Sequence, residues 1–382
     1  MDRGRQGAAD AQGAAVLMPY AVPRRGTVAV SDLPRQPFSP MELRENSAFL
    51  PRLEAMRGYA ALSVLAFHAC MLSWDMVATG MAPVVVFFVL SGFLLARSLD
   101  RDPDPVTFVR HRLFRLLPAA VATVLLLTLA YQTFGFYIGF LPSFDPFNVV
   151  LNALLIKSDI NGVMWSLTVE CVAVPVILIS HALLRRHGTT PVWLLVTFLF
   201  AIAFWGPYVH LLGGFTNLAP LYAFVVGLLV QSSRTTLTRG SQPPWAATIA
   251  AIALVVLVIV AVRKQTAVTI AFETLCASVL IWLAAFSPGK LVALRPLDLD
   301  IARFFGRISY SFYLLHMIGL AIATRLLPVE LDPVIRAAVL FLAALLITTP
   351  AAWLMCRFVE VPFIDLGRRR IVTRAADAAG RS

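Results

Sequence analysis

Residues 57–74 read RGYAALSVLAFHACMLSW, an apolar segment whose only charged side chain is that of Arg57 at its start. An apolar segment of about this length is typical of a helix that crosses a bilayer, because the hydrocarbon core needs about 20 residues of helix. Similar segments recur as far as residue 356. The pattern predicts a polytopic integral membrane protein.

The composition agrees with this prediction. The chain has 382 residues, of which 59% are hydrophobic and 14% charged, and its mean hydropathy is +0.79. A soluble domain has about 25% charged residues, so an ordinary soluble enzyme is excluded. We predict an all-α membrane bundle of about ten spans, at residues 57–74, 81–99, 117–139, 164–184, 190–206, 219–232, 244–262, 267–285, 308–326 and 335–356.

The basic residues predict the orientation of these spans. A net charge of +11 would suggest a nucleic-acid partner in a soluble chain, but in a membrane protein Lys and Arg mark the cytoplasmic side. With the N-terminus inside, 27 of the 32 basic residues fall on inner segments, and the outer five are Lys157, Arg263, Lys264, Arg325 and Arg336. We expect both termini in the cytoplasm, a multi-pass location in the cell (inner) membrane, and no nucleic-acid partner.

The ends of the chain differ in composition from its middle. Residues 1–47 are rich in Ala, Gly, Pro, Arg and Ser, which predicts a disordered cytoplasmic tail. We expect one membrane-embedded domain over residues 48–370 and a basic cytoplasmic tail over residues 371–382. The four cysteines form no C-x-x-C pair and have no histidine at ligand spacing, so neither a disulfide framework nor a metal site is indicated.

Arg57 and His68 are eleven residues apart in the first predicted span. Eleven steps of about 100° bring the two side chains to one helix face, about 16 Å apart along the axis. Arg57 would then lie at the cytoplasmic surface and His68 near the middle of the bilayer. A buried His68 could simply join two helices by a hydrogen bond, but ionisable groups inside a membrane are costly and usually functional. Arg57 could be an interfacial anchor or bind a ligand.

The sequence resembles the membrane-bound acyltransferase-3 family, whose members O-acylate surface polysaccharides, lipopolysaccharide, nodulation factors and macrolides. Six motifs stand in the family's order over about residues 48–370, namely Arg57-x10-His68, Phe87-Phe-Val-Leu-Ser91-Gly92, Phe108-Val-Arg110-His-Arg112-Leu-Phe-Arg115-Leu-Leu-Pro118, Trp165-Ser166-Leu-Thr-Val-Glu170, Gly306-Arg307-Ile-Ser309-Tyr310-Ser-Phe-Tyr313-Leu-Leu-His316 and Glu360-Val-Pro362.

This resemblance implies an acyltransferase that moves an acyl group, often acetyl, from acyl-coenzyme A to a hydroxyl of a glycan or glycosylated acceptor. Acyl-coenzyme A would be a co-substrate, with no bound cofactor. The resemblance also implies catalytic roles for Arg57, His68 and Glu170. The sequence departs from the family after Glu170, where Cys171-Val-Ala-Val-Pro175 replaces a second acidic or amide residue and aromatics.

The basic stretch has two interpretations. Its guanidinium groups could bind the phosphates of coenzyme A in bidentate fashion, or form a collar on anionic lipid. Charge alone favours the collar, whereas the family motif favours a phosphate site at Arg57, Arg110, Arg112 and Arg115.

Further candidates for the acceptor site follow from the other motifs. Nine residues after Arg307, His316 would lie near the level of His68, with Tyr313 on the same helix face. The two could bind the acceptor or form a structural network, and the resemblance adds Trp165 and Ser166. We place Glu170, and Glu273 in the eighth span, one to two turns below the outer surface, where either could bind sugar hydroxyls or orient His68. Either could instead pair with Arg263 or Lys264.

Two mechanisms and two other functions stay open at this stage. His68 could act as the general base on the acceptor hydroxyl, or could itself carry the acyl group. Alternatively, His68, His316 and Glu273 could relay protons in a carrier or flippase for a glycan or small acid. A scaffold subunit is also possible, but it leaves the Arg57–His68 spacing unexplained.

Overall fold

The computed structural model describes residues 50–74, 80–205, 220–233, 244–263, 265–286, 292–327 and 331–368. The predicted tails at residues 1–47 and 371–382 lie outside the described residues, so both stay predictions.

Helices make up the regular structure of the described residues, and within these ranges there is no strand. An α-helix therefore accompanies each of the ten predicted spans, with one short additional helix, α4. The α-helices are α1 (Pro51–Trp74), α2 (Met81–Arg101), α3 (Pro105–Phe134), α4 (Pro146–Ala153), α5 (Trp165–His187), α6 (Thr189–Trp205), α7 (Leu221–Ser232), α8 (Pro244–Ala261), α9 (Ala267–Phe286), α10 (Asp300–Leu326) and α11 (Pro333–Met355).

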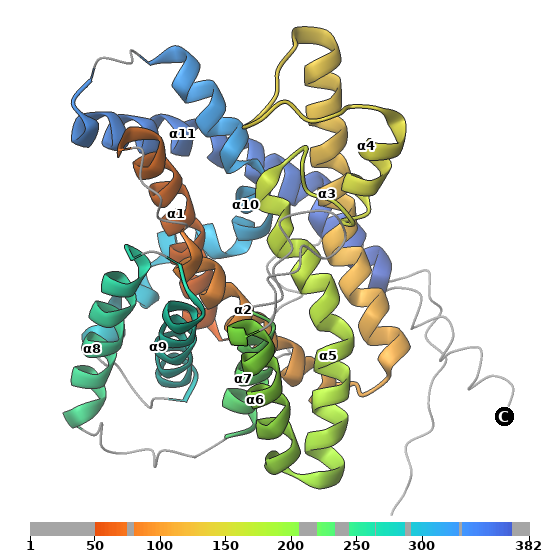
Figure 1. Ribbon diagram of the computed structural model, residues 1–382, viewed down its shortest axis with the longest axis vertical. Coiled ribbons are helices and arrows are strands. Elements are labelled where there is room, and N and C mark those ends of the chain that lie inside the picture. Colours follow the sequence, from red (N-terminus) through yellow and green to blue (C-terminus); the bar gives the residue numbers. More distant parts are fainter. Residues whose placement is uncertain are drawn as a thin grey trace, which may run out of the picture. The chain divides into compact units, whose positions relative to one another are not determined.

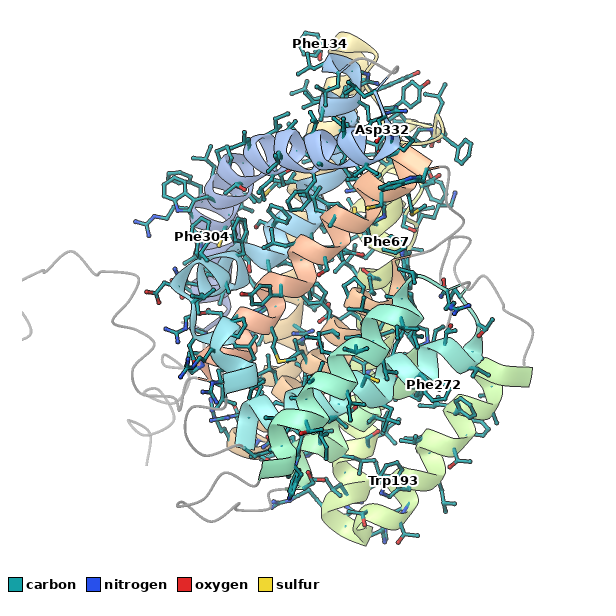
Figure 2. The ribbon with its side chains drawn as sticks, turned by 90° about the vertical axis from the view of Figure 1, so that its left-hand side faces the viewer. Phe67, Phe134, Trp193, Phe272, Phe304 and Asp332 are labelled. Carbon is teal, nitrogen blue, oxygen red and sulfur yellow. The ribbon has the colours of Figure 1, made fainter. Side chains whose placement is uncertain are left out.

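Six helical segments are long and apolar enough to cross a membrane by length and composition. They are Pro51–Trp74, Met81–Arg101, Pro105–Phe134, Gly162–His187, Ala267–Phe286 and Pro333–Arg368. Three shorter apolar helices, α6, α7 and α8, add to this set. Figure 2 labels Phe134, Trp193 and Phe272, whose side chains are between 49% and 86% exposed. Large apolar side chains on the outside of a bundle are typical of a surface that faces lipid.

Three helices begin with the dipeptide Asp-Pro. The carboxylates of Asp104, Asp145 and Asp332 accept hydrogen bonds from backbone N–H groups in the first turns of α3, α4 and α11. Each is followed by a proline, whose missing N–H costs nothing at the first helical position. At its other end α3 stops at Gly135, which has a φ of 64° that suits glycine.

Two pairs of helices far apart in sequence pack through glycine. Gly58 of α1 lies against Ala302 of α10, and Gly227 of α7 lies against Val89 of α2. A methyl group at either glycine would overlap a backbone carbonyl oxygen of the partner helix. Small residues let helices approach this closely where lipid provides no hydrophobic drive between them. The first contact brings α1 beside α10, although about 225 residues separate the two helices in sequence (Figure 1).

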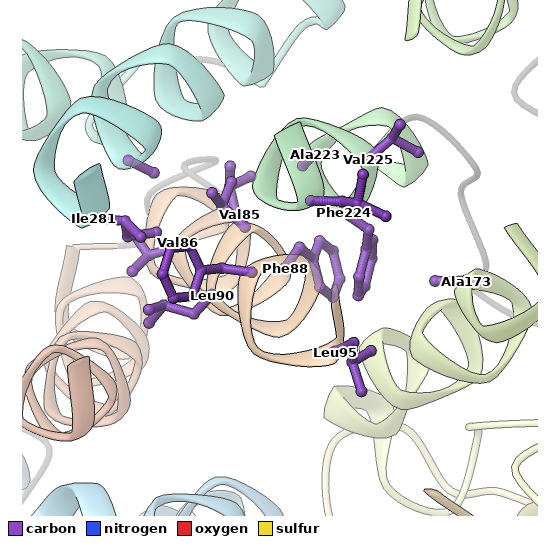
Figure 3. Close-up of a cluster of buried hydrophobic side chains, with 14 of the residues drawn as sticks. Val85, Val86, Phe88, Leu90, Leu95, Ala173, Ala223, Phe224, Val225 and Ile281 are labelled. Atoms are coloured by element: carbon purple, nitrogen blue, oxygen red, sulfur yellow. The ribbon is translucent and has the colours of Figure 1, made fainter. Parts of the chain in front are cut away.

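A buried apolar cluster fixes the position of α2. Phe88 of α2 stacks on Phe224 of α7 with ring centroids 4.6 Å apart. Figure 3 shows this pair with Val85 and Leu90 of α2 and Ile281 of α9 in the same cluster. The packed face of α2 also borders the site, because Phe88 and Leu90 line the cavity described below.

The last helical segment is longer than predicted. We expected the tenth span to end at residue 356, but a π-helical turn at Cys356–Glu360 continues α11, and the helix runs on to Arg368. Such turns are frequent at functional sites. Here the turn buries Glu360, whose carboxylate accepts a hydrogen bond from Ser311 of α10 at 3.0 Å.

Candidate functional site

A cavity of about 280 Å³ runs along one face of α2. The α2 residues that line it, most of them three or four apart, are Val84, Phe87, Phe88, Leu90, Ser91, Leu94, Leu95 and Ser98. From Val84 to Ser98 the helix rises about 21 Å at 1.5 Å per residue. The cavity is therefore elongated, with one end at Val84 and the other at Ser98.

The other walls of the cavity come from motifs spread over the whole chain. α1 contributes Arg57, α3 contributes His111, Arg112 and Arg115, α5 contributes Ser166 and Glu170, α10 contributes Tyr310 and Tyr313, and the C-terminal helix contributes Arg368. The predicted site residues Arg57, Arg112, Arg115, Ser166, Glu170 and Tyr313 thus meet at one cavity.

Arg112 and Glu170 form a largely buried ion pair in this cavity, between the third turn of α3 and the second turn of α5. Ser91 of α2 donates a hydrogen bond to the same carboxylate oxygen at 2.8 Å and accepts one from Arg112 at 3.3 Å. Three helices are therefore joined at one point. Within the described residues Glu170 makes no hydrogen bond to His68.

Glu170 meets the basic stretch. We expected Glu170 one to two turns below the outer surface and the basic stretch on the cytoplasmic side, but the two are in contact through Arg112. The reason is that the segment before α5 folds back into the bundle, where the side-chain amide of Asn161 donates to the backbone oxygen of Leu314, in the middle of α10, at 2.9 Å. α5 consequently begins beside Tyr313.

A hydrogen-bond network holds this folded-back segment. The carboxylate of Asp159 accepts from the side-chain amides of Asn148 and Asn152, and Asn152 accepts from the backbone N–H of Ile160 at 3.1 Å. Lys157 donates to Asn148 at 3.0 Å. These polar residues before α5 thus support the start of that helix.

Two guanidinium groups line the cavity without a direct partner. Arg57 and Arg115 form neither a hydrogen bond nor an ion pair with another side chain of the described residues. They lie within electrostatic reach of each other, and the carboxylates of Glu170 and Glu360 lie within reach of Arg57. Two like charges at one cavity, both free to donate, are suited to bind an anion such as a phosphate.

The basic stretch is divided between roles. Arg115 faces the cavity, Arg112 is paired with Glu170, and Arg110 lies outside the cavity lining with buried Nε and Nη2 atoms that have no partner among the described residues. Sequence reasoning missed His111 and Arg368, which both line the cavity. Helical spacing could have found His111, because it lies four residues before Arg115, but only the fold brings Arg368 there.

At the other end of the cavity, Tyr313 connects three elements. Its hydroxyl donates to the backbone oxygen of Val163 at 3.0 Å and accepts from the hydroxyl of Ser166 at 2.9 Å. The ring of Phe87 contacts the ring of Tyr313 edge-on, with centroids 6.1 Å apart. Trp165 lies outside the cavity lining, against Phe88, with ring centroids 6.3 Å apart.

The two predicted histidines are neighbours. Nε2 of His316 lies 3.4 Å from Nδ1 of His68, and the ring centroids are 5.1 Å apart. The prediction that His316 lies at the level of His68 is confirmed. Neither histidine is in the cavity lining, but His316 is one helical turn from Tyr313, and the two rings have centroids 5.5 Å apart.

Glu273 is separate from this group. It is 3% exposed, and its Oε2 atom has no hydrogen-bond partner among the described residues. No hydrogen bond or ion pair connects Glu273 with His68, His316 or Arg263 within the described ranges, and Lys264 lies outside them. A proton relay from the two histidines to Glu273 has no support from these contacts.

Comparisons with known proteins agree with the motifs. A family model described as an acyltransferase domain matches residues 50–357. The chain is 27% identical to the acyltransferase MdmB of Streptomyces mycarofaciens, over 86% of this chain and 96% of the relative. It is 30% identical to BcsY of Komagataeibacter xylinus, a protein named as a membrane-bound transacylase, over 76% of this chain and 78% of the relative. No solved structure matches the chain.

A shorter match covers 20% of the chain. Over this part the chain is 35% identical to YrhL of Bacillus subtilis, a protein named as a peptidoglycan O-acetyltransferase. The match covers 12% of YrhL.

Proposed function

This chain belongs to the membrane acyltransferase-3 family, and on that premise we propose that it transfers an acyl group, acetyl in the first instance, from acyl-coenzyme A to a hydroxyl of a glycan. Membership of the family makes it a transferase. The donor, the acceptor and the roles of individual residues are the proposal.

The observation that supports the proposal most is the cavity along α2. It has free guanidinium groups, Arg57 and Arg115, in its wall, and its Val84 end is lined by apolar rings. A coenzyme A thioester has the same polarity, because its phosphates are anionic and its acyl end is apolar. We propose that the phosphates bind Arg57 and Arg115, with His111 and Arg368 nearby, and that the acyl end reaches Tyr313.

The ion pair of Arg112 with Glu170 has a different part in this proposal. It leaves Arg112 with less capacity to bind a phosphate than Arg115 has. Arg112 and Glu170 would hold α3 and α5 at the distance that a narrow acyl donor needs.

His68 acts as the general base in the proposed reaction. The acceptor hydroxyl loses its proton to His68 and attacks the thioester carbonyl, the C–S bond breaks, and the proton then passes to the departing sulfur. The tetrahedral oxyanion needs hydrogen-bond donors. We propose the Tyr313 hydroxyl, which lines that end of the cavity and would have to exchange its bond to Val163 for one to the oxyanion. In a variant of this route His68 carries the acyl group itself, which requires no base at the first step.

The proposed membrane arrangement has ten spans with both termini in the cytoplasm of a bacterial cell, across the inner membrane. It is supported by the distribution of basic residues and by the helix at each predicted span. This orientation places Arg57 and the basic stretch of α3 on the side where acyl-coenzyme A is made.

A glycan is the acceptor class that we propose. YrhL is named for acetyl transfer to peptidoglycan, and the match with it supports a sugar hydroxyl. MdmB and BcsY are named only as acyltransferase and transacylase, so their names leave the acceptor open.

The experiment is acetyl transfer from radiolabelled acetyl-coenzyme A in membranes that contain the wild type or the His68→Ala variant, with a crude cell-envelope glycan extract as acceptor. We expect label in the glycan with the wild type only. Transfer at the wild-type rate by a well-expressed His68→Ala variant would refute the role of His68. Proton-coupled uptake of a glycan without consumption of acetyl-coenzyme A would favour a carrier instead.

A further inference from the structure

The hydrogen atoms of the two neighbouring histidines can be assigned from their partners. Nδ1 of His316 lies 2.6 Å from the backbone oxygen of Tyr313, and Nδ1 of His68 lies 2.9 Å from the backbone oxygen of Val64. A carbonyl oxygen only accepts, so both Nδ1 atoms must carry hydrogen. In the neutral form of each ring, Nε2 then has the lone pair.

This assignment gives the contact between the rings a direction. Nε2 of His316 has a lone pair and faces Nδ1–H of His68 at 3.4 Å. His68 therefore donates, sharing its hydrogen between Val64 and His316, and His316 accepts. The distance is long for a hydrogen bond, but catalytic hydrogen bonds are often long before the substrate binds and shorten in the complex.

The assignment also determines which nitrogen of His68 can act as a base. With Nδ1–H engaged, Nε2 is the atom that can take a proton, and within the described residues it has no hydrogen-bond partner. His316 is 1% exposed, so its ring is held by packing as well as by the bond to Tyr313. Tyr313 in turn is held by Val163 and Ser166 at the end of the cavity.

We propose that His316 is a positioning residue for acyl transfer, which keeps His68 in the tautomer whose Nε2 is the base and accepts the Nδ1–H bond when His68 becomes an imidazolium. This inference rests on the proposed function of His68. His316 would thus have the role that a carboxylate has where it orients a catalytic histidine. Here the acceptor is a neutral imidazole, which adds no net charge inside the membrane. His316 stays neutral throughout, and only His68 gains and loses a proton.

Two variants separate this role from a structural one. The side-chain amide of Asn places its donor where Nδ1 of His316 lies, so His316→Asn keeps the bond to Tyr313 and loses the contact with His68. The longer Gln reaches the position of Nε2, so His316→Gln keeps an acceptor for His68 and loses the bond to Tyr313. A structural role thus predicts that Asn is tolerated, and a positioning role predicts that Gln is tolerated.

The test measures kcat and the KM for acetyl-coenzyme A in the radiolabel assay, with protein amount and melting temperature in detergent checked for each variant. We expect His316→Asn to lower kcat by about 100-fold, the cost of a misplaced catalytic group, and His316→Gln by less than about 5-fold. KM should stay within about twofold for both variants, because His316 does not line the cavity. His187→Ala serves as the control, since His187 is exposed at the end of α5.

Equal kcat values for the Asn and Gln variants, or a higher value for Asn, would overturn the proposal. His316→Ala is a third variant, which removes both contacts of the ring. If the Ala variant fails to fold, the comparison of kcat between the Gln and Asn variants still tests the proposal. Wild-type transfer in the same membranes reports on the proposed function separately. Transfer by the wild type with no advantage of Gln over Asn refutes the role of His316 alone.

Discussion

Arg112 and Glu170 are 58 residues apart in sequence and form a largely buried ion pair at the cavity, and the hydroxyl of Ser91 is hydrogen-bonded to both side chains. The pair connects the basic stretch of α3 with the Trp-Ser-Leu-x-x-Glu motif of α5, two motifs that sequence reasoning assigned to different ends of the enzyme.

The first prediction concerns the stability of this pair. Glu170→Ala should lower the free energy of unfolding by about 3–5 kcal/mol, because it leaves the Arg112 guanidinium buried without its counter-charge. The measurement is thermal unfolding in detergent. Asp300→Ala removes the exposed partner of Arg303 and should leave the melting temperature unchanged. A Glu170→Ala protein as stable as the wild type would show that the pair contributes nothing to the fold.

The second prediction concerns the donor site. Arg57→Lys and Arg115→Ala should each raise the KM for acetyl-coenzyme A by about 10-fold or more, because a bidentate guanidinium contact with a phosphate is lost. Arg110→Ala should have a smaller effect, since Arg110 is outside the cavity lining. Steady-state kinetics over a range of donor concentrations provides the values, and Arg186→Ala at the exposed end of α5 is the control. An unchanged KM for Arg57→Lys would make Arg57 an interfacial anchor.

The third prediction concerns the acyl chain. Phe87 lines the cavity and contacts Tyr313, so Phe87→Ala should enlarge the acyl end. We expect the ratio of butyryl to acetyl transfer to rise by about 15-fold, since butyryl has two more methylenes than acetyl and each one buried is worth about 0.8 kcal/mol. Competition between the two donors measures the ratio directly. Phe134→Ala, at an 86% exposed position, is the matched substitution that should not change it.

The fourth prediction concerns helix packing. Gly227→Ala places a methyl group against the backbone oxygen of Val89 and should destabilise the protein by about 1–3 kcal/mol, because α2 and α7 must move apart. In Gly162→Ala the added methyl group meets open space, so this variant should melt with the wild type. If both variants had the same melting temperature, close approach of the two helices would not be needed for stability.

The fifth prediction concerns the start of α3, which carries the basic stretch. Hydrogen bonds from Thr107 and Val106 to the carboxylate lower the pKa of Asp104 below its usual range. A lowered pKa in the folded state means that the carboxylate stabilises the helix above its ordinary pKa, and that this contribution disappears as the pH falls through the folded-state value. Asp104→Ala should therefore melt below the wild type at pH 7, with the difference vanishing in strong acid. Melting curves across pH test this, and a difference independent of pH would contradict it.

The sequence alone was sufficient for the helical class, the approximate helix positions and the family. Long apolar segments have one stable conformation in a bilayer, because every backbone group must be hydrogen-bonded within the segment. The rise per residue within a helix is also constant, so spacing gives relative positions along its axis. For the same reason His68 and His316 could be placed at one level before their contact was known.

Contacts between helices were decided only by the tertiary structure. The contact of Glu170 with Arg112 was not predicted, because the spacing within α5 does not reveal that the preceding segment folds back to Leu314. Which arginine is paired and which is free also depends on neighbours that lie far away in sequence: Arg112 meets Glu170, whereas Arg115 lies near Arg57. Two side chains can pair only if their helices lie close enough together. Glycine contacts and buried rings set the distance between helices, and each of these contacts involves residues from two helices that are far apart in sequence.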